Sequence, residues 1–329
     1  MNRLRKLADY RQSYWLDDLS RDLLRSGDLP RRIREKGLRG ITSNPAIFSQ
    51  AIGGSTAYDE QISRSARSGK PALQISEELT CQDIREACDA LLPVYRDTEG
   101  LPAVEELLYR GISVNVTLLF SVEVYQAVAE AWLKAMERRL AAGQPLNNVS
   151  SVASCFVSRI DTLVDQLLAH RIRPDGTSAL TPHPKSLQGK VAVANAKLAY
   201  AAFRRMAGSE RWQAGAAAGA KPQRLLWAST GNKNPACSDV GYVEPLIGAH
   251  TVNAMPAATA AAFADHGKPG KNLSRAVPVA RKSLKEIKAL GIDLKRVTWQ
   301  LENEGIQKFI EPFEKLIGNI EAKRKALAG

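Results

Sequence analysis

The chain has 329 residues, of which 44% are hydrophobic and 24% charged, proportions typical of a globular protein with a sizeable core. No apolar run is long enough to cross a membrane, and no signal-peptide stretch follows the basic first residues, so the sequence predicts a cytoplasmic protein without a membrane partner. The net charge of +12 favours anionic ligands, whereas the scattered basic pairs match no nucleic-acid-binding motif. A basic nucleic-acid-binding protein is the remote alternative.

The predicted elements alternate between strands and helices along the chain. Strands are expected at Ser13–Asp17, Leu38–Thr42, Ile112–Phe120, Ser151–Val157, Arg224–Ser229 and Thr251–Met255. Helices are expected at Arg31–Lys36, at Pro45–Arg67 with an interruption at Gly53–Gly54, at Leu73–Leu92 ended by Pro93, at Pro102–Tyr109, after a Ser121 cap, at Ile160–Leu168 and at Leu187–Met206.

This alternation predicts a parallel α/β fold, and a TIM-type barrel fits it better than an open sheet because each strand ends in polar residues. We expect one domain over residues 1–329, with an excursion at 171–222 and a helical extension at 267–329. A closed barrel of this type needs eight strands. The sequence provides about six, so the predicted barrel is incomplete.

The sequence GITSNPAIF at Gly40–Phe48 places a polar corner between a strand and a helix. Asn44 has the residue type of a helix N-cap, and Pro45 suits the first helical position. Side chains at such corners also point into the active-site mouth of α/β folds. Asn44 is therefore either a cap or a substrate-binding residue, and its spacing alone does not separate the two.

Several sequence motifs, in one order, resemble those of the transaldolases, in particular the longer bacterial subfamily. They are Trp15–Ser20, Gly40–Phe48, Glu99–Ala103, Gly111–Ser121, Ser151–Arg159, Trp227–Pro235, Thr251–Pro256 and Glu304–Pro312. The resemblance implies a class I aldolase-type barrel that transfers a dihydroxyacetone unit between sugar phosphates in the pentose phosphate pathway. The family performs this transfer through a Schiff base on a lysine and implies no cofactor. The sequence also shows no metal-ligand spacing among its four histidines and four cysteines.

The resemblance implies catalytic roles for Asp17, Asn44 and Thr117. Asp17 would be the carboxylate that transfers a proton during carbon–carbon cleavage. Its alternative role is a helix N-cap, which spacing alone favours. Asn44, Asn115 and Thr117 would hydrogen-bond the substrate hydroxyls and an ordered water. Asn115 and Thr117 are two residues apart on a strand, so both are expected on the same side.

The resemblance also implies a substrate-binding set formed by Ser154, Phe156, Arg159 and Ser229. Arg159 suits bidentate phosphate binding, although a surface salt bridge would use the same side chain. Ser229, at the end of the strand Arg224–Ser229, matches the family's second strand-to-helix corner on the side of the site that binds phosphate. Lys233 lies near it and is the weaker assignment. Sugar phosphates are therefore the expected partners.

The chain departs from the family at one point. In the family, the strand-three glutamate and the strand-four lysine lie between the motifs that correspond to Tyr95 and Glu99. In this chain Tyr95 and Glu99 are almost adjacent, and the Lys-Val-Pro string that holds the family's lysine does not occur. Lys134, Lys190 and Lys197 all fall in predicted helices. The sequence therefore predicts that fructose 6-phosphate forms no Schiff base here. The alternatives are an active transaldolase and an impaired one that binds sugar phosphates, with association through exposed strand edges possible in either case.

Overall fold

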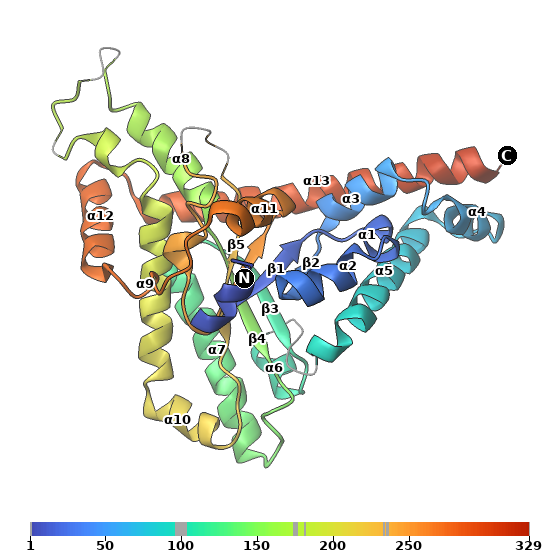
Figure 1. The fold of residues 1–329 in the computed structure, drawn as a ribbon, viewed down its shortest axis with the longest axis horizontal. Coiled ribbons are helices and arrows are strands. Elements are labelled where there is room, and N and C mark those ends of the chain that lie inside the picture. The colour runs from blue at the N-terminus through green and yellow to red at the C-terminus, as the bar shows by residue number, and fades with distance from the viewer. Residues whose placement is uncertain are drawn as a thin grey trace. The chain divides into compact units, whose positions relative to one another are not determined.

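The computed structural model describes residues 2–95, 104–173, 177–180, 182–232, 234 and 237–328. These residues form an α/β fold with six strands and many helices, consistent with part of a TIM-type barrel followed by C-terminal helices (Figure 1). The chain divides into two compact units. The larger contains Arg3–Ser13 and Asp97–Asn303, and the smaller contains Tyr14–Arg96 and Glu304–Gly329.

The smaller unit contains a parallel strand pair, β1 (Gln12–Asp17) and β2 (Leu38–Thr42). Its helices are α1 (Arg21–Arg25), α2 (Asp28–Arg31), a π-helix (Arg32–Lys36), α3 (Pro45–Gly54), α4 (Asp59–Arg67), α5 (Ala72–Tyr95) and the second part of α13 (Leu294–Ala328). The register places Trp15 opposite Gly40 and Asp17 opposite Thr42. The last residues of the two strands therefore lie side by side.

Gly40 is required by this register. A Cβ atom at Gly40 would lie 2.5 Å from Cε2 of the Trp15 indole, closer than two carbon atoms can approach. Trp15 itself is buried, so the indole has little room to move. The first residue of the GITSNPAIF sequence is thus explained by packing against β1.

The core of the smaller unit contains side chains from both ends of the chain. Its buried members come from α3, α4, α5, α13 and the residues just before α1 and α4, and are Leu19, Phe48, Ile52, Tyr58, Ile62, Ala72, Ile75, Leu79, Leu316 and Ile320. The Asn319 amide also donates a hydrogen bond to the Ser49 carbonyl at 3.3 Å. The C-terminal part of α13 is therefore an integral wall of this unit.

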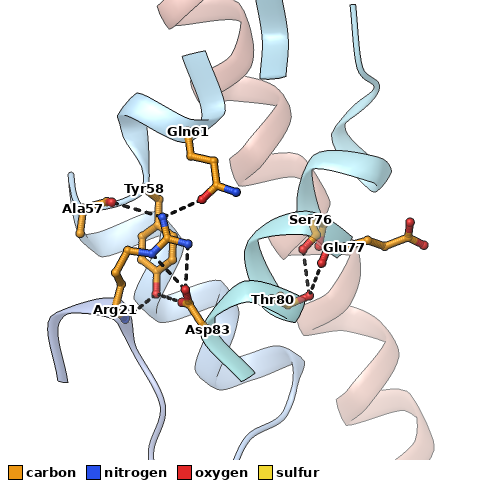
Figure 2. A network of polar contacts seen from close by, with 8 residues as sticks. All are labelled: Arg21, Ala57, Tyr58, Gln61, Ser76, Glu77, Thr80 and Asp83. Atoms are coloured by element: carbon orange, nitrogen blue, oxygen red, sulfur yellow. Dashed lines mark hydrogen bonds and ion pairs between the residues drawn. The ribbon is translucent and has the colours of Figure 1, made fainter. Parts of the chain in front are cut away.

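A buried ion pair joins three helices of the smaller unit (Figure 2). Arg21 donates to the Asp83 carboxylate from Nη2 at 2.8 Å and from Nε at 3.0 Å. Tyr58 Oη donates to the other Asp83 oxygen at 2.8 Å and accepts the Arg21 backbone N–H at 2.8 Å. Gln61 accepts a further guanidinium hydrogen bond at 2.9 Å. The sequence analysis did not predict this network.

The larger unit contains the other four strands, β3 (Val114–Leu119), β4 (Ser151–Phe156), β5 (Arg224–Ala228) and β6 (Thr251–Met255), each parallel to its neighbour in this order. Its helices are α6 (Val104–Tyr109), α7 (Val122–Ala141), α8 (Ser158–Ala169), α9 (Val191–Ala207), α10 (Glu210–Ala217), α11 (Ala257–His266), α12 (Val277–Ala289) and the start of α13. Short 3-10 helices lie at Arg5–Tyr10, Pro184–Leu187 and Glu244–Leu246.

The larger core forms where the helices cover these strands. Trp227 on β5 is fully buried and donates from its indole nitrogen to the Leu246 carbonyl at 3.0 Å. Trp132 on α7 is also fully buried and lies 4.9 Å from the Trp212 ring, measured between centroids. Ser121 caps α7 as expected, since its hydroxyl accepts the Val124 N–H at 3.0 Å.

Several expectations change in the structure. The helix expected to stop at Pro93 continues to Tyr95, and the interruption expected at Gly53–Gly54 falls directly after Gly54, between α3 and α4.

The expected chain break and the strand pairing across it are not decided by the described residues. Positions 96–99 lie outside them, and the two units are described separately. The single-domain expectation likewise stays a prediction. Within the described ranges, no helix is both long and apolar enough for a bilayer crossing. The same ranges contain no group of three or more His, Cys, Asp or Glu residues placed to hold a metal ion.

Candidate active site

Asp17 lies at the carboxyl end of β1 and is held by its strand neighbour. Thr42 Oγ1 donates to Asp17 Oδ1 at 2.6 Å, a contact that follows from the β1–β2 register. Burial raises the pKa of Asp17, and the Thr42 hydrogen bond offsets part of this effect. A raised pKa makes the protonated form of a carboxyl group more accessible, which suits a residue that gives and takes a proton.

Asn44 follows β2 directly and caps α3. Its side-chain oxygen accepts the backbone N–H groups of Ala46 at 2.9 Å and Ile47 at 3.1 Å, and its backbone is extended. The capping interpretation of this residue is therefore correct. Capping uses only the side-chain oxygen, and the amide nitrogen is a separate hydrogen-bond donor.

On β3, Asn115 is linked to the next strand of the larger unit. Ser154 Oγ on β4 donates to the Asn115 side-chain oxygen at 2.5 Å. Thr117 is exposed. The β3–β4 register shifts between Val116 and Leu119, and Leu118 has a left-handed φ of 60°. A bulge of this kind redirects side chains and is common beside active sites, so regular alternation does not fix the direction of Thr117.

Hydrogen bonds join the corners that follow β4 and β5. Ser158 donates its N–H to the Ser229 carbonyl at 3.1 Å, and the hydroxyls of the two residues are 3.1 Å apart. Ser229 has a left-handed φ of 55°, which is strained for a residue with a side chain. Strain of this kind is concentrated at functional sites, so it supports a role for the Ser229 corner.

Arg159 and Phe156 also lie together at this corner. The Arg159 guanidinium carbon is 5.3 Å from the centroid of the Phe156 ring, within cation–π range. Such stacking orients a planar guanidinium without using its hydrogen-bond donors. Lys233, the weaker assignment, lies outside the described residues.

The sequence analysis missed a polar cavity beside this corner. It has a volume of about 300 Å³ and is lined by Ser158, Asp161 and Tyr242 among others. Burial raises the pKa of Asp161 to about 6, although the Ala192 N–H and Tyr242 Oη both donate to its oxygens, at 2.8 Å and 3.0 Å. A signal existed in the sequence, since Ser158, Asp161 and Asp165 recur at helical spacing on α8.

Three lysines that the sequence analysis weighed as nucleophiles are placed on helices. Lys197 on α9 donates to the backbone carbonyls of Asn272 at 2.7 Å and Arg275 at 2.9 Å. Lys190, at the start of α9, donates to the Ser186 carbonyl at 2.7 Å. Lys134 is exposed on α7. Partial burial lowers the pKa of Lys197, but its ammonium group is held by backbone carbonyls of the chain, whereas a Schiff-base lysine must be aimed at the substrate carbonyl.

Comparison with known proteins decides the family. A family model described as transaldolase/fructose-6-phosphate aldolase matches residues 14–97 and 92–320. The chain belongs to this family. It is 40% identical to a transaldolase of Trichodesmium erythraeum, in an alignment that covers 99% of this chain and 98% of that protein. It is also 40% identical to transaldolase 2 of a Nostoc species, in an alignment that covers 100% of this chain and 99% of that protein. A transaldolase of Thermobifida fusca is 39% identical over 96% of this chain and 97% of its own length.

The same comparisons show where this member of the transaldolase family is shorter. The alignment with the Trichodesmium protein extends over 374 positions, whereas the chain has 329 residues, so at least 45 positions of that relative have no counterpart here. The family match breaks into two pieces that meet at residues 92–97. This break lies beside Thr98 and Glu99, where the sequence places the missing strand-three and strand-four segment.

Proposed function

We propose that this chain serves the transaldolase reaction, the transfer of a dihydroxyacetone unit between sugar phosphates. The observation that carries the proposal is the identity of about 40% to transaldolases over almost the whole chain. The raised pKa of Asp17 and the hydrogen-bonded corner at Ser158 and Ser229 give it chemical support. A cytoplasmic location and sugar-phosphate partners are part of the same proposal.

The proposed mechanism is given for the residues of each unit separately. Asp17, held by Thr42, moves the proton that carbon–carbon cleavage requires, and Asn44 donates to a substrate hydroxyl through its amide nitrogen. In the larger unit Asn115 and Ser154 form a hydrogen-bonded pair for the hydroxyls of the sugar. Arg159 and Ser229 bind the phosphate group, which a guanidinium contacts in a bidentate manner.

A second candidate is specific to this chain. The alignment break at residues 92–97 removes the segment in which the family carries its lysine, and no Lys-Val-Pro replaces it. A chain without that nucleophile would bind sugar phosphates in the same site and would leave the carbon–carbon bond intact, because the Schiff base supplies the electron sink for cleavage.

Borohydride trapping separates the two candidates. Full-length protein is incubated with fructose 6-phosphate, reduced with borohydride and weighed by intact mass spectrometry, while binding is followed by titration calorimetry. The transfer reaction requires one stable sugar adduct on one lysine, and peptide mapping would identify that lysine. The sequence expectation is that no adduct forms. Fructose 6-phosphate binding without an adduct would establish the second candidate. Absence of both the adduct and the binding would rule out both candidates.

Replacing Arg159 with alanine should weaken sugar-phosphate binding by about 1.5–3 kcal/mol, the scale of a hydrogen bond to a charged group. Titration with fructose 6-phosphate measures the change. Arg173, in the excursion after α8, is a matched control, because its replacement removes the same charge elsewhere in the larger unit. Equal affinity of the Arg159 variant and the unmodified chain would contradict the phosphate assignment.

A further inference from the structure

A separate cavity of about 610 Å³ lies in the larger unit. Its walls are the end of the Arg5–Tyr10 helix, the end of α9, residues 247–250 before β6, and the loop that holds Lys271. Residues 247–250 of this lining come directly before β6, whereas Phe156 and Ser229 lie at the carboxyl ends of β4 and β5. The strands are parallel, so the cavity opens at the opposite end of the sheet from the proposed transfer site.

Backbone hydrogen bonds fix the walls of this cavity relative to one another. The His250 N–H donates to the Arg11 carbonyl at 3.0 Å, which joins the first wall to the residues before β6. The Ile247 carbonyl accepts N–H groups from Asn272 at 3.2 Å and Leu273 at 3.1 Å, which attaches the loop. A cavity with walls tied in this way loses little conformational freedom when a ligand enters.

The charge of the cavity is positive. Arg11, Arg204 and Lys271 line it, and Asp9 is its only lining carboxylate. Among the described residues these three cations form no ion pair. The imidazole of His250 is neutral at pH 7, since partial burial and the nearby Arg11 and Arg224 lower its pKa. The C-terminal end of α9 contributes only about half a negative charge, so the net charge of the cavity lining stays positive.

The cavity also has an aromatic wall. Tyr10, Tyr200, Phe203 and His250 line it, and the rings of Phe203 and His250 are 6.1 Å apart between centroids. Tyr10 is half-buried and His250 is exposed, so their rings are accessible to a ligand. We propose that this cavity binds a nucleotide, with the phosphate at Arg204 and Lys271 and the base against Tyr10 and His250. The volume suits a small-molecule site.

The test is titration calorimetry of the full chain with adenosine 5′-monophosphate, carried out with fructose 6-phosphate at saturating concentration. One saturable site is expected. Arg204→Gln and Lys271→Gln should each raise the dissociation constant by about 10-fold or more, because each removes a charge-assisted hydrogen bond to phosphate. Arg205→Gln is the matched control, since Arg205 is the next residue on α9, is exposed and does not line the cavity. Its affinity should be unchanged.

Four results would overturn the proposal. An equal loss in the Arg205 variant would mean that the protein attracts the nucleotide through diffuse charge alone. Affinity for inorganic phosphate equal to that for the nucleotide would mean that the base is not recognised. Affinity for adenosine equal to that for the nucleotide would mean that the phosphate is not recognised. Nucleotide binding that appears only when fructose 6-phosphate is left out would place the nucleotide in the transfer site. The proposed function fails in a different way, through absence of fructose 6-phosphate binding in a separate titration.

Discussion

Replacing Asp83 with alanine should lower the free energy of unfolding of the smaller unit by about 3–5 kcal/mol, because it leaves the Arg21 cation buried without its partner. Arg21 and Asp83 are 1% and 0% exposed, so water cannot compensate for the lost contacts. Urea unfolding followed by circular dichroism measures the change. Hydrogen exchange of α5 and α3 assigns it to this unit.

Two further variants test whether burial causes this effect. Glu60→Ala removes a pair with Arg64 whose side chains are 88% and 73% exposed, and should change stability by less than about 1 kcal/mol. The double variant Arg21→Met/Asp83→Leu should recover much of the stability, since an apolar pair removes both buried charges. A small effect of Asp83→Ala would mean that the site admits water or rearranges.

The stability of the larger unit should depend on the ionisation of Asp161. Its folded-state pKa of about 6 lies above the value of 3.8 for an unperturbed group, because burial disfavours the carboxylate. The folded state therefore binds more protons than the unfolded state between about pH 4 and pH 6. The resulting stabilisation is complete below pH 4 and is lost as the pH rises through 6. The difference between the two pKa values corresponds to about 3 kcal/mol.

Asp161→Asn isolates this contribution, since asparagine stays uncharged. Urea unfolding of both proteins from pH 4 to pH 7 should show the unmodified chain losing about 3 kcal/mol relative to the variant. Tyr242→Phe should make the loss larger, because the Tyr242 hydroxyl donates to the carboxylate and holds its pKa down. Parallel pH profiles for the unmodified chain and Asp161→Asn would rule out Asp161 as the titrating group.

The strands were predictable because each is a short apolar run that ends in polar residues. Leu38–Thr42 and Thr251–Met255 have the predicted bounds, and the other strands differ from theirs by one or two residues at an end. The Asn44 cap was also predictable, since capping depends on neighbouring backbone groups. Local sequence is sufficient for features of this kind.

Features that depend on distant residues were not predictable. Arg21 and Asp83 each read as an ordinary charged residue of a helix surface, and only the packing of α1, α4 and α5 encloses them together. The bulge in β3 after Val116 has no sequence signal of its own, so the alternation of Asn115 and Thr117 could not reveal it. The Ser158–Ser229 contact likewise depends on the alignment of two strands.

The composition of the smaller unit has a consequence for biosynthesis. More than 200 residues lie between the two chain segments of this unit, Tyr14–Arg96 and Glu304–Gly329. At about 5–20 residues per second, the ribosome needs roughly 10–40 seconds to make the intervening chain. During that interval Phe48, Ile52 and Ile75 lack the Leu316 and Ile320 side chains that complete their core. We therefore expect the nascent N-terminal segment to expose apolar side chains, and to need protection from aggregation, until α13 has been synthesised.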